Sequence, residues 1–212
     1  MAVPAGRHSV RQIILREGLE IDDPLDATLR FVEAYPAYDS HDSRPSSFDE
    51  GDLRQANRGG ARISAAEKAA ILERRSQIER ALRSIAPEAS LTDADELIPW
   101  RSLTRLFDAF AGISGVGFSK MTKALHPKRR ALIPLLDSVV QTYLATDEPN
   151  PPPASFGARA TTLVESYKHD LDRNLAALRQ VQRELVRRGY SSLTEVRILD
   201  VLVWSVYAPA KP

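Results

Sequence analysis

The sequence predicts an all-α fold, and three observations support this fold class. Apolar residues recur at spacings of three and four along most of the 212 residues, as on one face of a helix. Two segments, Ser64–Glu67 and Ser192–Glu195, have the Ser-x-x-Glu pattern of a capping box, which begins helices. Pairs of β-branched runs joined by hairpin turns are missing. A content of 43% hydrophobic and 27% charged residues is ordinary for a soluble globular protein.

The N-terminal half is expected to hold short helices separated by turn-forming residues. In order, the segments are helices at 9–18 and 24–35, a polar loop at 36–48, a helix at 50–58, and a helix from Ser64 to Ile85 with a break near Ser76. Two aspartates ahead of Pro24 are a helix start signal. Gly59-Gly60 and Pro87 end the two later helices.

Longer helices are expected in the C-terminal half. A short start at 92–95 precedes a strongly amphipathic helix at 100–112. The proline-rich segment 149–153 is the clearest break, and a long helix at 160–188 follows it and ends at Gly189. The last helix, opened by Ser192, is apolar on most sides and is predicted to be buried. We therefore expect a helical domain over 1–148 and a C-terminal helical pair over 154–212 that packs on the same core.

Composition excludes several kinds of site. Without cysteine there is no disulfide framework, thiolate zinc site or iron–sulfur cluster. The four histidines are scattered without ligand spacing, so neither a metal nor a cofactor is expected. Trp100 and Trp204 are expected in the core. No apolar run is long enough to span a membrane or to form a signal peptide, which predicts a cytoplasmic protein without a membrane partner. The oligomeric state stays open.

The net charge of +1 hides two segments of opposite sign. From Asp39 to Asp52, five acids stand against Arg44 alone. From Ala109 to Leu136 there is no acid, and the five cations are Lys120, Lys123, Lys128, Arg129 and Arg130. The basic segment permits a nucleic-acid partner, and the alternative is a solvated helix face.

The most informative stretch of the sequence is a glycine turn between two predicted helices. Gly115 and Gly117 flank Val116, so the backbone can turn tightly with no side chain over its amides. The helix that follows offers unpaired N–H groups and a positive dipole end, which suit a phosphate. Lys120 and Lys123 lie one turn further on, within reach of neighbouring phosphates.

This stretch, 103–126, resembles the helix-hairpin-helix motif of non-sequence-specific DNA-binding proteins. Positions that fit the motif are Phe110, Ile113, Gly115, Val116, Gly117 and Ala124, while Met121 stands where the motif has a small residue. The resemblance implies duplex DNA as the partner, contacted through Gly115, Val116, Gly117, Ser119, Lys120, Lys123, Lys128 and Arg129. The alternative is that the glycine turn only ends one helix and begins the next.

A second match extends the resemblance to the helix-hairpin-helix DNA glycosylases, over Leu103–Tyr143. In that family a catalytic aspartate lies about 20 residues after the second glycine, and here Asp137 lies 20 residues after Gly117, followed by Ser138-Val-Val. The resemblance implies that Asp137 is the catalytic carboxylate. The alternative is that Asp137 is an ordinary helix N-cap. The same block also looks like an uncharacterised bacterial family.

Departures from the glycosylase pattern restrict the expected chemistry. Ser119 occupies the position of the Schiff-base lysine, and Lys120 is one residue late, which rotates its side chain by about 100°. Val139 replaces the family's histidine. Gln55 is the candidate for the side chain that fills the gap left in the duplex.

The sequence thus predicts a DNA-binding protein that resembles a monofunctional DNA glycosylase, which hydrolyses the N-glycosidic bond of a flipped base. Two alternatives stay open at this point. One is a non-catalytic DNA-binding or protein-interaction module that keeps the hairpin. The other is a helical partner-binding protein in which the glycine turn is only structural.

Overall fold

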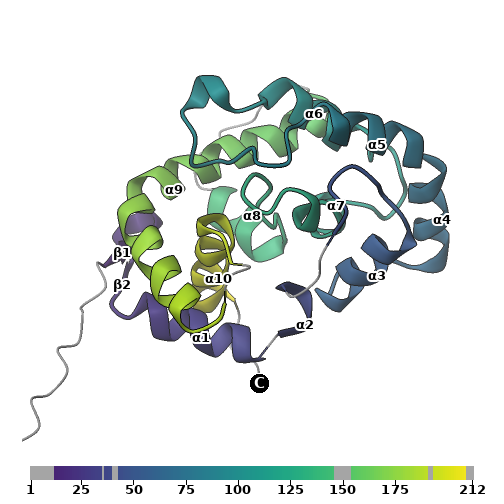
Figure 1. The fold of residues 1–212 in the computed structure, drawn as a ribbon. Coiled ribbons are helices and arrows are strands. Elements are labelled where there is room, and N and C mark those ends of the chain that lie inside the picture. The colour runs from purple at the N-terminus through teal and green to yellow at the C-terminus, as the bar shows by residue number, and fades with distance from the viewer. Residues whose placement is uncertain (1–11, 35, 40–42, 146–153, 191–192, 209–212) are drawn as a thin grey trace, which may run out of the picture.

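The structure, a computed structural model, describes residues 12–34, 36–39, 43–145, 154–190 and 193–208. Helices form most of the described chain (Figure 1), which confirms the all-α fold. Among the described residues the only sheet pairs two short antiparallel strands, β1 (Ile13–Ile14) and β2 (Glu20–Ile21). No helix in these residues combines the length and apolar character needed to cross a bilayer.

The helix predicted at 9–18 is wrong over its described part, where the chain forms a β-hairpin. Glu17 and Gly18 have positive φ angles of 58° and 72°, which turn the chain tightly within the 3₁₀ helix η1 (Arg16–Gly18). Tertiary contacts hold this hairpin. The Asn174 side chain accepts from the Ile14 N–H and donates to its carbonyl, and the buried Arg16 pairs with Asp170 at 2.6 Å.

The following helices agree with the patterns that predict them. They are α1 (Pro24–Ala34), α3 (Glu50–Arg58), α4 (Ala65–Glu73) and α5 (Arg75–Arg83). The capping box at Ser64 and Glu67 is confirmed, because each side chain bonds the other residue's backbone N–H. The break between α4 and α5 lies at Arg74, two residues before the predicted position.

The polar loop predicted at 36–48 is wrong in part, because Pro36–Asp39 form the short helix α2. Tyr38 and Asp39 are buried there. The Tyr38 hydroxyl donates to the Lys123 carbonyl, and Asp39 pairs with Arg197 at 2.8 Å. These partners lie more than 80 residues away in the sequence, so local polarity does not reveal them.

The C-terminal half supplies the centre of the molecule. Its elements are η2 (Asp95–Leu97), α6 (Trp100–Asp108), α7 (Phe118–Leu125), η3 (His126–Lys128), α8 (Ser138–Leu144), α9 (Phe156–Arg187) and α10 (Glu195–Tyr207). The α10 helix is capped by Thr194, whose side chain accepts from the Arg197 N–H, rather than by Ser192, which lies outside the described residues.

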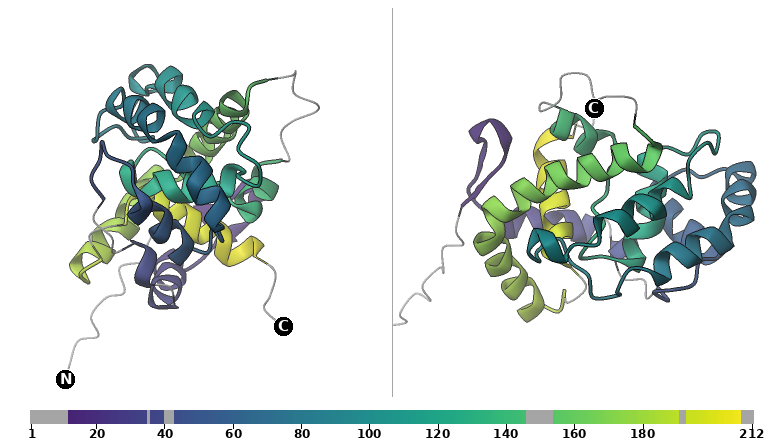
Figure 2. Two further views of the ribbon diagram at one scale, coloured as in Figure 1. Left: turned by 90° about the vertical axis from the view of Figure 1, so that its right-hand side faces the viewer. Right: turned by 90° about the horizontal axis from the view of Figure 1, so that it is seen from above.

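Helix α9 spans the molecule, from α6 at its N-terminal end to the β-hairpin (Figure 2). It packs on α6 and α10, and one apolar core joins residues from Ile13 to Val203. The α10 helix is buried from Val196 to Val203, as predicted, whereas Val206 near its C-terminal end is exposed. The proline-rich segment 149–153 lies outside the described residues. Trp204 is half-buried, and its ring contacts Phe31 edge-on at a centroid distance of 5.6 Å.

Candidate nucleic-acid interface

The glycine turn forms a hairpin between α6 and α7. Gly115 has a φ of +77°, a backbone conformation that favours glycine, and Gly117 is the extended N-cap of α7. Ile113 and Val116 point into the core, while Gly115 and Gly117 are exposed. Among the described residues no side chain caps α7, so the first amides of this helix can donate to a ligand.

Met121 and Ala124, on the inner face of α7, are both fully buried. The larger methionine at the position where the motif has a small residue is therefore accommodated by the core.

The ammonium of Lys120 is paired with an acid of another helix. It contacts both carboxylate oxygens of Glu67, at 2.6 and 2.8 Å. This hydrogen bond is the main cause that lowers the pKa of Glu67. Glu67 belongs to the start of α4, so the pair joins α4 to the hairpin.

Lys128 and Arg129 are buried, so the structure does not present them at the surface where the sequence predicts that they contact DNA. The Lys128 ammonium lies 2.6 Å from Asp52, in a pair whose side chains are 2% and 5% exposed. The Arg129 guanidinium donates to backbone carbonyls, namely those of Pro45, Leu82, Ile85 and Lys128. Charges out of reach of solvent need such partners, and they are out of reach of a phosphate as well. The alternative interpretation, in which the cations of the basic segment form a solvated helix face, is wrong for these two residues.

Asp137 is the N-cap of α8. One of its carboxylate oxygens accepts from the N–H groups of Val139 and Val140, both at 3.1 Å. The N-cap interpretation is therefore confirmed, and it is compatible with a chemical role because the side chain is only half-buried. No hydrogen bond among the described residues engages its second oxygen.

Three side chains hold the backbone that leads to Asp137. The Leu135 N–H donates to Asp200 of α10 at 3.1 Å, and the Leu136 N–H donates to Thr122 of α7 at 3.0 Å. The amide of Gln141 donates to the Leu136 carbonyl. The carboxylate is thus fixed relative to both α7 and α10.

Lys123 lies on the same side of α7 as Ser119, one turn further along. Burial lowers the pKa of Lys123, and the charge of Asp137 opposes this shift. No hydrogen bond or ion pair within the described chain engages its ammonium. The charge of Asp137 thus acts on Lys123, which follows Ser119 by one turn of α7.

Gln55 is buried, and its proposed role in filling a gap in the duplex is wrong. Its side chain is 1% exposed and donates to the Tyr38 carbonyl at 2.6 Å. A side chain held in this way is not available to enter a duplex.

A buried charged network behind Asp137 is absent from the sequence predictions. Arg197 pairs with Asp39 and lies 5.4 and 5.5 Å from the ring centroids of Phe31 and Tyr38. Asp200, one turn later on α10, is 2% exposed, and its Oδ1 has no hydrogen-bond partner within the described part of the chain. Burial raises the pKa of Asp200 to about 8. The signal in the sequence is the presence of two charges three residues apart, Arg197 and Asp200, among the apolar residues that follow Glu195 in this helix.

Replacing Asp200 with asparagine is expected to remove a pH dependence of stability. Between the ordinary pKa of 3.8 and the folded value of about 8, the folded state binds more protons at this group, so stability falls as pH rises. Burial lowers the pKa of His126 from its ordinary 6.5 to about 4. Between these two values the unfolded state binds more protons at this group, so the contribution of His126 to stability rises with pH, opposite to that of Asp200. Between pH 6.5 and 8 only Asp200 of these two contributes, by about 2 kcal/mol. Urea unfolding should show this fall in the parent and its loss in Asp200→Asn.

The control for this prediction is Asp26→Asn, which changes an exposed carboxyl on α1. Its pH profile should match the parent's. A fall between pH 6.5 and 8 that persists in Asp200→Asn contradicts the assignment to this carboxyl.

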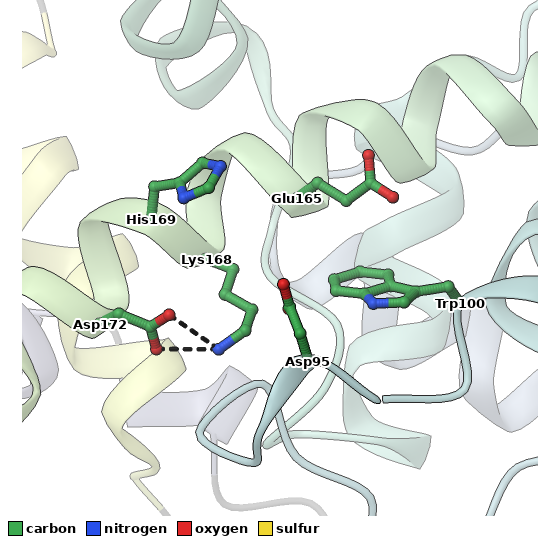
Figure 3. Close-up of a pocket in the computed structure, with 6 residues that line it drawn as sticks. All are labelled: Asp95, Trp100, Glu165, Lys168, His169 and Asp172. Atoms are coloured by element: carbon green, nitrogen blue, oxygen red, sulfur yellow. Dashed lines mark hydrogen bonds and ion pairs between the residues drawn. The ribbon is translucent and has the colours of Figure 1, made fainter. Parts of the chain in front are cut away.

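A separate pocket of about 200 Å³ lies between α9 and the segment before α6 (Figure 3). Its lining residues are Asp95, Trp100, Glu165, Lys168, His169 and Asp172. Lys168 is held by Asp172 and by the carbonyls of Leu91 and Asp93. No group of three or more metal-ligating side chains occurs in the described part of the chain. The pocket shares no residue with the glycine turn, with α7 or with Asp137.

Comparison with protein families gives one match. A model described as a family of unknown function (DUF6308) matches residues 25–207, which is most of the chain. The chain therefore belongs to this family. Comparison with curated proteins and with solved structures gives no match.

Proposed function

We propose, for this member of a family without an assigned function, that the protein binds duplex DNA through the α6–α7 hairpin and acts as a monofunctional DNA glycosylase. The observation that carries the proposal is the position of Asp137. It caps α8, the helix that follows α7 and η3 in the chain, and its charge acts on Lys123 of α7. An uncapped helix start and a half-buried carboxylate thus belong to one structural unit.

The DNA contacts in this proposal come mainly from the backbone. The free amides at the start of α7 and the exposed Gly115 and Gly117 suit a phosphate oxygen, since helix N-termini favour anions. Ser119 and Lys123 follow on one side of the same helix. Because Lys128 and Arg129 are buried, the interface carries fewer cations than the sequence suggests.

Asp137 supplies the chemistry in this proposal. A flipped nucleotide loses its base when the N-glycosidic bond breaks and the bonding electrons leave with the base. The carboxylate stabilises the positive charge that develops on the sugar, and water then adds to the anomeric carbon. The proton that this water loses passes to the carboxylate and from there to the departing base. Ser119 carries no amine and cannot form a Schiff base, so the product is an abasic site in an intact strand.

Binding to duplex DNA is expected to depend on salt with a shallow slope. Five phosphate contacts would give a slope of log affinity against log salt of about −4.5, whereas about two contacts give about −2. Lys123→Gln should weaken binding and make the slope shallower, because it removes a cation of α7 on which the charge of Asp137 acts. Fluorescence anisotropy with a labelled duplex over a salt series measures both quantities.

The matched control is Arg30→Gln on α1, which removes one exposed cation that pairs only weakly with Asp26. It should leave the affinity unchanged. Absence of duplex binding by the parent at low salt contradicts the DNA proposal.

A non-catalytic interaction module is the second candidate. It is favoured by the ion pairing and the burial of cations in the basic segment 109–136. Lys120 is neutralised by Glu67, and Lys128 and Arg129 are buried. Incubating the parent with duplexes that carry different damaged or modified bases separates the two candidates. Abasic sites in any of them support the glycosylase, while duplex binding with every base left in place supports the module.

A further inference from the structure

Glu67 lies directly against the glycine turn of the hairpin. A Cβ atom built on Gly115 would come within 2.2 Å of Glu67 Oε1 and 3.2 Å of its Cδ. The carboxylate therefore occupies space that opens only because residue 115 is a glycine. Glu67 Oε2 also accepts from the Ser64 N–H at 2.8 Å, so the acid is fixed to the start of α4.

Lys120 holds this carboxylate from the other side. Its ammonium reaches both oxygens of Glu67, and the two side chains are 23% and 15% exposed. Lys120 lies in the first turn of α7, next to the free helix amides. The carboxylate of Glu67 is thus already bound at the place where the hairpin presents Gly115, the ammonium of Lys120 and the start of α7.

A carboxylate and a phosphate are bound by the same donors, because both present anionic oxygens to ammonium and N–H groups. A duplex phosphate that approaches Gly115 and Lys120 meets the charge of Glu67. Either the phosphate is repelled, or Glu67 gives up Lys120. The pair is partly exposed, and ion pairs of this kind contribute little to stability, so the second outcome is energetically accessible.

We propose that Glu67 is an internal competitor for the phosphate site of the hairpin, and that duplex DNA displaces it from Lys120. The inference rests on the proposed DNA binding and adds a regulatory element to it. The carboxylate lowers the affinity for DNA by keeping one cation neutral, and any change that draws α4 away from the hairpin raises this affinity.

Glu67→Gln tests the proposal. Glutamine in this position still supports a capping box, so α4 keeps its start. The variant should bind a labelled duplex about tenfold more tightly, the scale of one charge-assisted hydrogen bond. Its log–log salt slope should be steeper by about 0.9, the increment for one more phosphate contact. Lys120→Met should then weaken binding more in the Glu67→Gln background than in the parent.

The control is Glu184→Gln, which removes one acid that pairs with Arg187 near the C-terminal end of α9. It should bind like the parent. Circular dichroism checks that each variant is folded, and Glu67→Asp, with a shorter side chain, should shift the affinity in the same direction if Glu67→Gln does not fold.

The outcomes distinguish this inference from the proposed function. If the parent binds DNA and Glu67→Gln binds with the same affinity and salt slope, the competition is wrong and the DNA proposal stands. If neither protein binds a duplex at low salt, both are wrong. Tighter binding with a steeper slope supports both.

Discussion

Asp137→Asn is expected to lower the rate of base removal by about 10²–10⁴-fold, the usual contribution of a positioned acid or base. The reason is that the amide has no negative charge to stabilise the sugar cation or to take a proton from water. The fold should persist, because an asparagine oxygen can still accept from Val139 and Val140 and keep the N-cap of α8. Duplex affinity should change little.

The measurement is the yield of abasic sites in a duplex with a modified base, revealed by strand cleavage in hot alkali. Asp49→Asn is the matched control, since it makes the same chemical change at the N-cap of α3, and it should keep the parent's rate. Nicking without alkali or heat should not occur, because Ser119 forms no Schiff base. If Asp137→Asn keeps the full rate, or if it unfolds while the parent leaves every base in place, the carboxylate is structural.

Local sequence signals predict most of the helices, because the contacts that begin and end a helix are local. Ser64 and Glu67 cap α4 as the pattern indicates, and the helix predicted at 24–35 is present as α1 from Pro24. The β-hairpin at Ile13 is different. Its conformation depends on Asn174 and Asp170, which are more than 150 residues away, and no local pattern contains that information.

In the candidate site, too, some features could be predicted from the local sequence and others could not. The turn at Gly115 and the cap at Asp137 follow from short-range spacing and are present in the structure. The burial and pairing of the cations do not follow from short-range spacing, because they depend on partners elsewhere in the chain. Lys128, Arg129 and Arg130 each have a partner in the segment 39–52, which the sequence shows to be acidic. Lys128 pairs with Asp52, whereas Arg129 and Arg130 donate to the backbone carbonyls of Pro45 and Asp39. The opposite charge of the two segments was therefore a usable signal that the segments lie against each other.

Lys128→Met is expected to lower the free energy of unfolding by about 3–5 kcal/mol, the usual effect of removing one partner from a buried ion pair. The methionine leaves Asp52 buried without its cation, since the carboxylate lies 2.6 Å from the Lys128 ammonium and is 5% exposed. The loss of the hydrogen bond to the Arg44 carbonyl adds to the effect. Urea unfolding followed by circular dichroism measures it.

Two further variants separate this burial effect from a loss of surface charge. Arg30→Met removes a cation whose side chain is 74% exposed in its pair with Asp26, and it should change stability by less than about 1 kcal/mol. The double variant Lys128→Met, Asp52→Asn should lose less than the sum of its single variants, because the second change removes the charge that the first leaves unpaired. If Lys128→Met instead leaves stability intact and weakens duplex binding, Lys128 is exposed in solution and belongs to the DNA interface.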